Sequence, residues 1–219
     1  MLKYSCLVLD HDDTVVQSEA TINYPFFCQI LDQFRPGATI TLQDYVQGCS
    51  DYGFVDMCRK RFQFTDAELE TEYCGWKEYI RNHIPAPYDG IGELLSKYRQ
   101  DGGIICVVSM SSSENILRDY KTHFGIVPDA VYGWDLSAEH RKPNPYAIYE
   151  IMEQFHLCKS DLLIVDDMKP AWEMARAAEV DIAFAGWGRI DYPKITQEMT
   201  KLCDYSFSST KALTDFLFL

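Results

Sequence analysis

The pattern of apolar and polar positions along the chain predicts a set of buried strands. Residues 4–9 form a short apolar run without polar alternation. Such a run is typical of a strand that is covered on both faces within a parallel sheet. Further strands are predicted by apolar runs at residues 104–108, 131–133, 162–165 and 182–185 and near Tyr205.

Apolar residues spaced three and four positions apart predict helices between these strands. One helix is expected to follow Gly90, and another to end at Phe124. Further helices are expected to begin at Asn144 and Pro145, to cover residues 171–178 and to begin at Lys211. Strands that alternate with helices indicate a parallel sheet with helices on both faces. The sequence therefore predicts an α/β fold with a Rossmann-like, doubly wound parallel sheet.

Residues 19–84 differ from the rest, because they show helical spacing and no strand pattern. Thr41 with Asp44 and Thr65 with Glu68 have the spacing of residues that cap helix N-termini. We interpret residues 48–53, which begin and end with glycine, as a flexible loop between two of these helices. The prediction is an all-helical domain at 19–84, inserted into a core made of residues 1–18 and 85–219.

The amino-acid composition argues against several classes of protein. The chain has 219 residues, of which 47% are hydrophobic, so a packed core needs no disulfide support. Its eight cysteines are scattered, which favours free thiols, and its net charge of −13 argues against binding nucleic acid or anionic membranes. Apolar runs are too short to span a bilayer. We therefore expect a soluble cytoplasmic protein, a monomer or weak homodimer, without nucleic-acid or membrane partners.

Three acids follow the first strand, at Asp10, Asp12 and Asp13. Carboxylates this close repel one another unless a cation or a proton intervenes, so the spacing suggests a divalent metal site at the carboxyl edge of the sheet. Aspartates in an ordinary turn are the simpler alternative. A calcium-binding EF-hand loop is excluded, because Val15 and Thr21 stand where that loop needs Gly and Glu.

The pattern Asp10-x-Asp12-x-Thr14 resembles the first motif of the haloacid dehalogenase-like superfamily of phosphohydrolases. That family has three further motifs in a fixed order. The chain matches them with Ser109 after a strand, Lys142 before two prolines, and Asp166-Asp167 after another strand. Response-regulator receivers have the acidic pair first and the lysine last, so the order separates the two families. The helical insert resembles the small cap of the phosphoglycolate phosphatase and β-phosphoglucomutase branch.

The resemblance implies a Mg²⁺-dependent phosphatase acting on a small phosphorylated metabolite. In that family's scheme Asp10 attacks phosphorus, and Asp12 protonates the leaving oxygen. Mg²⁺ is expected on Asp10, the backbone carbonyl of Asp12 and the pair Asp166 and Asp167. Phosphoryl oxygens are expected to contact Ser109, the following amide of Met110, and Lys142. Within the cap, Ser50, Asp51 and Tyr52 are expected to bind the rest of the substrate, and the basic residues 59–61 are a second candidate.

Some residues depart from the family pattern, and other functions stay open. Asp13 and Glu179 stand where glycine is usual, Ala171 stands where a second acid is common, and His11 is unusual between the first two acids. A dehalogenase would not need Asp12. A phosphomutase of the same family remains an alternative, and so does a catalytically silent binding or regulatory protein on this fold.

Overall fold

The computed structural model describes residues 2–218. Contacts divide the chain into two compact units, one made of residues 1–17 and 87–219 (the core) and one of residues 18–86 (the cap). All eight cysteines are free thiols, as their scatter predicted. Within residues 2–218, no helix combines the length and the apolar character that a membrane span requires.

The core contains one parallel sheet of six strands in the order β3-β2-β1-β4-β5-β6. This arrangement confirms the predicted doubly wound α/β fold, with the first strand of the chain at the centre of the sheet. The strands are β1 (Cys6–Leu9), β2 (Ile104–Val108), β3 (Ala130–Tyr132), β4 (Leu162–Asp166), β5 (Asp181–Ala185) and β6 (Tyr205–Phe207).

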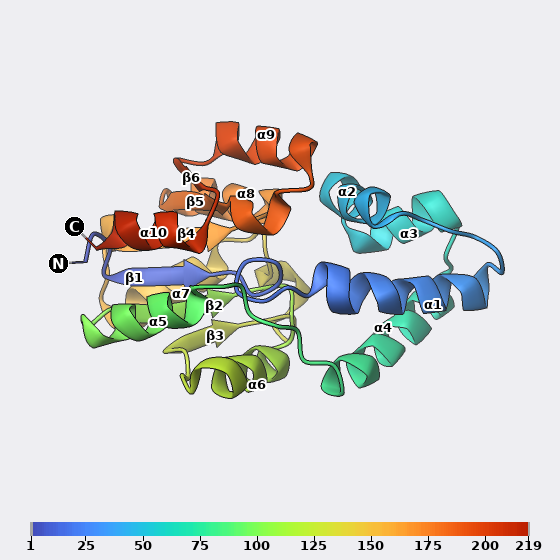
Figure 1. Cartoon of the computed structure of the whole chain (residues 1–219), viewed down its shortest axis with the longest axis horizontal. Coiled ribbons are helices and arrows are strands. Elements are labelled where there is room, and N and C mark those ends of the chain that lie inside the picture. The colour runs from blue at the N-terminus through green and yellow to red at the C-terminus, as the bar shows by residue number, and fades with distance from the viewer. Residues whose placement is uncertain (1, 219) are drawn as a thin grey trace. The chain divides into compact units, whose positions relative to one another are not determined.

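Helices cover both faces of this sheet (Figure 1). Because successive side chains of a strand point to opposite faces, the residues of β1 divide between two apolar clusters. Leu7 and Leu9 face the cluster that includes α5 (Ile91–Gln100), α6 (Ser113–Phe124) and α10 (Thr210–Leu217). Cys6 and Val8 face the cluster that includes α7 (Tyr146–Phe155) and α8 (Lys169–Ala178). Burial on both faces explains why the strand sequences are continuously apolar.

The sequence pattern did not predict several short helical segments of the core. They are α9 (Pro193–Leu202) and the 3₁₀ turns η2 (Ala138–His140), η3 (Lys159–Asp161) and η4 (Gly186–Arg189). Only Ile195 and Met199 of α9 are buried, so its apolar stripe is narrow. The other signal for α9 is Pro193 at its first position, where a missing N–H costs nothing.

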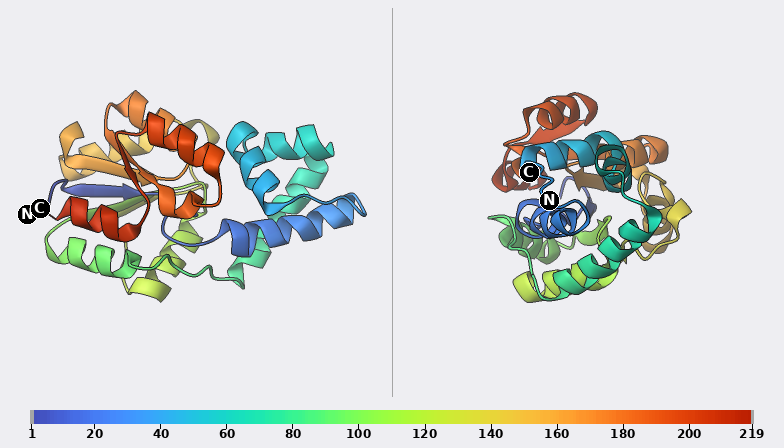
Figure 2. Two further views of the ribbon diagram at one scale, coloured as in Figure 1. Left: turned by 45° about the horizontal axis from the view of Figure 1, so that its top comes forward. Right: turned by 90° about the vertical axis from the view of Figure 1, so that its right-hand side faces the viewer.

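The cap consists of a short π-helical segment, η1 (Glu19–Asn23), and four α-helices (Figure 2). The helices are α1 (Tyr24–Phe34), α2 (Leu42–Tyr52), α3 (Phe54–Phe62) and α4 (Asp66–Arg81). Helix α1 packs against α4, and α2 packs against α3. Both predicted helix starts are confirmed: Thr41 accepts a hydrogen bond from the Asp44 amide, and Thr65 and Glu68 form a complete capping box.

The predicted loop at residues 48–53 is wrong, because α2 continues through Tyr52 and only Gly53, at φ 76°, breaks the helix. Gly48 is a packing residue instead of a hinge: a Cβ there would lie 2.7 Å from the Met57 side chain of α3. The Gln47 side chain donates to Asp51 Oδ1 at 2.8 Å, one helical turn onward. Close packing against α3 therefore holds this glycine within the helix, against its intrinsic preference.

Aromatic side chains make up the centre of the cap. The ring of Phe27 on α1 lies 5.1 Å from that of Tyr45 and 5.8 Å from those of Phe54 and Phe62, centroid to centroid. These separations are favourable for aromatic pairs, and Phe27 is fully buried. The cap therefore has an apolar core of its own.

Candidate active site

Asp10 is the first residue after β1, and the sheet register places it beside β4. Leu9 pairs with Val165 across the two parallel strands, and the Asp10 amide donates to the Val165 carbonyl at 2.9 Å. The next residues of β4 and its loop are Asp166 and Asp167. Two strands that are adjacent in space and distant in sequence thus end in acids at one edge, where ligands of open α/β sheets bind.

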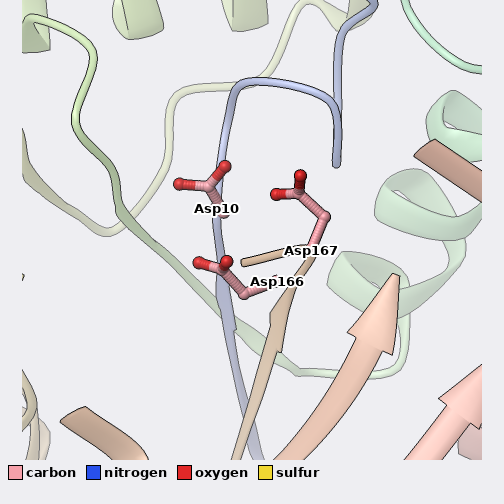
Figure 3. Close-up of side chains that lie close together, drawn as sticks. All are labelled: Asp10, Asp166 and Asp167. Atoms are coloured by element: carbon pink, nitrogen blue, oxygen red, sulfur yellow. The ribbon is translucent and has the colours of Figure 1, made fainter. Parts of the chain in front are cut away.

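Asp10, Asp166 and Asp167 form a buried acidic cluster (Figure 3). Each offers a carboxylate oxygen, and these oxygens all lie within 4.8 Å of one another. The residues are 7%, 2% and 1% exposed, respectively. Burial makes their mutual repulsion stronger than it is in water. An oxygen-only set of this kind suits a hard cation such as Mg²⁺.

Lys142 compensates part of this charge. Its Nζ lies 2.6 Å from Asp10 Oδ1 and 2.5 Å from Asp166 Oδ2, with 4% of the side chain exposed. Burial disfavours the ammonium, but the two carboxylates outweigh this, and the pKa of Lys142 is raised above its ordinary value. The lysine is therefore charged at neutral pH, and it holds the Asp10 carboxylate in one orientation.

Burial also raises the pKa values of the acidic pair. The pKa of Asp166 is raised to about 6 by burial, against the opposing charge of Lys142. The pKa of Asp167 is raised well above its usual range, again by burial, although Arg189 opposes the shift. Ionised carboxylates at these positions are thus costly without a further cation. The donor atoms, the burial and the uncompensated charge all fit a divalent metal ion.

Asp12 lies in the turn that follows Asp10. In this turn the Asp13 amide donates to the Val16 carbonyl at 2.7 Å and the Val15 amide to the His11 carbonyl at 3.0 Å. Asp13 takes up the left-handed conformation, at φ 53°, which aspartate tolerates better than most residues. The Asp12 side chain is partly exposed and is not one of the three clustered acids. It is therefore the acid of this turn that solvent reaches.

Ser109 follows β2 at the same edge of the sheet. Leu9 of β1 pairs with Val107 of β2, so Ser109 and Asp10 follow neighbouring strands. The Ser111 amide donates to the Ser109 Oγ at 3.2 Å, while Met110 between them is 46% exposed. This loop leads into the N-terminus of α6, an end of a helix that favours anions.

Several contacts at this edge were not predicted from the sequence. Arg189 pairs with Asp13 and Asp167, and the Thr14 Oγ1 donates to Asp167 Oδ1 at 3.3 Å. His11 Nε2 lies 3.1 Å from Asp119 Oδ2 on α6, and both side chains are buried. His11 thus ties the first turn to α6. An isolated arginine and an acid within a helix carry no sequence signal for these roles.

The predicted substrate-binding pair of the cap, Ser50 and Asp51, lies in the last turn of α2. A nearby pocket of about 440 Å³ is lined by other residues of α2 and α3, namely Gly48, Tyr52, Met57, Lys60 and Arg61. The Lys60 Nζ lies 4.6 Å from the centroid of the Tyr52 ring. The cap therefore presents a recess with basic and aromatic walls, which Ser50 and Asp51 do not line.

Comparisons with known proteins give a family and a fold. The family model for haloacid dehalogenase-like hydrolases matches residues 7–185. A protein from Lactobacillus delbrueckii subsp. bulgaricus, proposed to be a phosphoglycolate phosphatase, has a TM-score of 0.78 at 18% identity, with 100% of both chains covered. CbbY from Rhodobacter sphaeroides, solved in complex with phosphate, has a TM-score of 0.65 at 15% identity, covering 83% of this chain and 85% of CbbY. A comparison with curated proteins gave no match.

Proposed function

Because this chain belongs to the haloacid dehalogenase-like hydrolases, we propose that it is a Mg²⁺-dependent phosphatase acting on the phosphate monoester of a small metabolite. The observation that carries the proposal is the buried cluster of Asp10, Asp166 and Asp167, with Lys142 bridging two of its members. Similarity to CbbY, whose structure contains phosphate, supports phosphate as the group that is bound.

Asp10 is the proposed nucleophile. Lys142 holds its Oδ1 at 2.6 Å and so fixes the orientation of the carboxylate. An Asp10 oxygen forms a bond to phosphorus while the bond from phosphorus to the ester oxygen breaks, which leaves an aspartyl phosphate. When bound, Mg²⁺ would be held by Asp10, Asp166 and Asp167, with the Asp12 carbonyl as a further donor, and would neutralise phosphoryl charge.

Asp12 is the proposed general acid and base. In the first half-reaction it gives a proton to the departing ester oxygen, and it is then ionised. In the second it takes a proton from the water that attacks phosphorus, so that inorganic phosphate leaves and Asp10 is regenerated. Its partial exposure suits a group that must exchange protons with substrate and water.

Ser109 and Lys142 are proposed to position the phosphoryl group. The Ser109 hydroxyl can donate to a phosphoryl oxygen, and the Met110 amide lies in the same loop. The Lys142 ammonium adds a fixed positive charge. This charge attracts a dianionic phosphate group, which the three nearby carboxylates would otherwise repel. A chain of net charge −13 would otherwise repel such a substrate.

The proposal is tested by measuring phosphate release from a panel of sugar, nucleotide and small-acid phosphates. Activity is expected with Mg²⁺ and not in excess chelator, and Asp10→Asn should abolish it because an amide cannot form the acyl phosphate. Mass spectrometry of acid-quenched protein should find phosphate on Asp10 in the unmodified chain. The exposed Asp101→Asn is the matched control. Full turnover by Asp10→Asn, or in excess chelator, would refute the mechanism.

A further inference from the structure

Beside the acidic cluster lies a second group of buried charges, centred on Arg189. Its Nη1 donates to Asp13 Oδ2 at 2.6 Å, and its Nη2 lies 2.5 Å from Asp167 Oδ2. The side chains of Arg189, Asp13 and Asp167 are 4%, 7% and 2% exposed. Asp167 Oδ2 receives no aligned hydrogen bond from Arg189, so the contact between them is an ion pair alone. One guanidinium therefore bridges the first turn and the acidic cluster.

The backbone fixes this arginine in place. Arg189 ends η4, which lies directly against the turn that contains Asp13. A Cβ at Gly188 would come within 1.9 Å of the Asp13 carbonyl oxygen, so only glycine allows this approach. The Trp187 Nε1 donates to the Thr14 carbonyl at 3.0 Å. These contacts hold the segment against the first turn, and they leave the guanidinium between the carboxylates of Asp13 and Asp167.

The buried charges that these ion pairs join are matched to a divalent ion. Asp10, Asp13, Asp166 and Asp167 face two cations, Lys142 and Arg189. With all six groups ionised the formal charge is −2, which one Mg²⁺ would neutralise. Losing Asp13 alone changes this to −1, and losing Arg189 alone changes it to −3. Asp13 and Arg189 thus compensate each other, in a position where the family pattern has glycine in place of the acid.

We propose that Asp13 is a positioning residue for the metal site, acting through Arg189. Asp13 pairs with one nitrogen of the guanidinium and so weakens the attraction between Arg189 and Asp167. The Asp167 carboxylate is then able to bind Mg²⁺. Without Asp13, the whole charge of Arg189 falls on Asp167 and competes with the metal. This inference rests on the proposed function, because it concerns the same Mg²⁺ site.

The test measures Mg²⁺ affinity by isothermal titration calorimetry on the whole chain, without substrate. Asp13→Asn keeps the size of the side chain and tolerates the left-handed turn, so the fold is expected to persist. We expect its affinity for Mg²⁺ to fall by at least about tenfold, as loss of one nearby charge in a buried site predicts. Adding Arg189→Met should restore the affinity to within about threefold of the unmodified chain, because the formal charge returns to −2.

A purely structural role gives a different order of affinities. In that case the double variant would bind Mg²⁺ no better than Asp13→Asn, and this result would overturn the inference. Unchanged affinity in Asp13→Asn would do the same, even if the double variant failed to fold. Asp191→Asn is the matched control, because it removes an equal charge from an exposed position two residues beyond Arg189. If the unmodified chain bound no Mg²⁺ at all, the proposed function itself would fail.

Discussion

Neighbouring acids of the site differ in exposure, and the proposed mechanism gives them different roles. Asp10 and the pair Asp166 and Asp167 are buried, and the pair's pKa values are raised because burial penalises their charge. Asp12 is more exposed and stands outside that cluster. A buried acid beside a lysine suits metal binding or nucleophilic attack, whereas a partly exposed acid suits proton transfer. One short turn can therefore supply both roles.

The proposed role of Asp12 as general acid predicts a dependence of the rate on the leaving group. Asp12→Asn should slow hydrolysis of an alkyl phosphate by on the order of 10² to 10⁴, the usual range for loss of a general acid. For an aryl phosphate the loss should be smaller, since the departing phenolate hardly needs a proton. Steady-state kcat for the two esters, measured with saturating Mg²⁺, makes the comparison. Equal losses on both esters would instead assign Asp12 to holding the turn.

The sequence predicted the acids of this site better than the contacts among them. Asp10 and Asp166 follow apolar strands, and parallel strands bring such positions to one edge. Arg189 could not be predicted in the same way, because its role depends on the close approach of Gly188 to a turn far away in sequence. The helical course of α2 past Gly48 was likewise missed, because packing on Met57 overrides the weak helix propensity of glycine.

Among the secondary-structure elements, strands were predicted more closely than helices with little buried surface. The predicted strand at residues 104–108 has the bounds of β2, since both of its faces are covered. Helix α9 was missed because most of its residues are polar and two buried side chains give too little periodicity. Helix α4 was found from its capping box. A helix that buries only a narrow stripe of side chains is thus the element that the pattern of apolar positions predicts least well.

Helix α4 carries a buried acid, Glu72, which should make the stability of the cap depend on pH. Glu72 is 7% exposed, and burial raises its pKa to about 7. Tyr45 of α2 and Cys58 of α3 are the titratable groups whose pKa values respond to its charge. In the unfolded chain a glutamate ionises near pH 4.3. As pH rises from about 4 to 7 the unfolded state therefore loses its proton first, and the cap becomes less stable.

Glu72→Gln removes this penalty. The variant should be more stable than the unmodified chain at pH 8, by at most about 4 kcal/mol, and its advantage should disappear near pH 4. Urea unfolding at pH 5 and pH 8, followed by circular dichroism, measures the difference. Glu78→Gln, an exposed acid on the same helix, is the control. An unchanged pH dependence in Glu72→Gln would show that this carboxyl stays solvated.

For the whole molecule, the proposed function assigns different parts of recognition to the two units. In the proposed mechanism the groups of the core contact what all phosphate esters share, namely phosphate, metal and the ester oxygen. Discrimination among esters must then come from contacts to the rest of the substrate. The inserted cap offers a recess of about 440 Å³ whose walls include Tyr52, Lys60 and Arg61. Basic and aromatic side chains of this kind suit a polar or anionic group.

The recess gives a prediction about substrate selectivity, in which Ser50 and Asp51 serve for comparison. Replacing Tyr52 and Lys60 together with alanine should lower kcat/KM for the best physiological ester by at least about tenfold, or about 1.4 kcal/mol of transition-state binding. Hydrolysis of a small aryl phosphate should change little, because it has no group for the recess. Replacing Ser50 and Asp51 with alanine is the matched control, since both lie on α2 outside the recess. A larger effect from that pair would return selectivity to the end of α2, and equal losses on both substrates would assign the recess to cap stability.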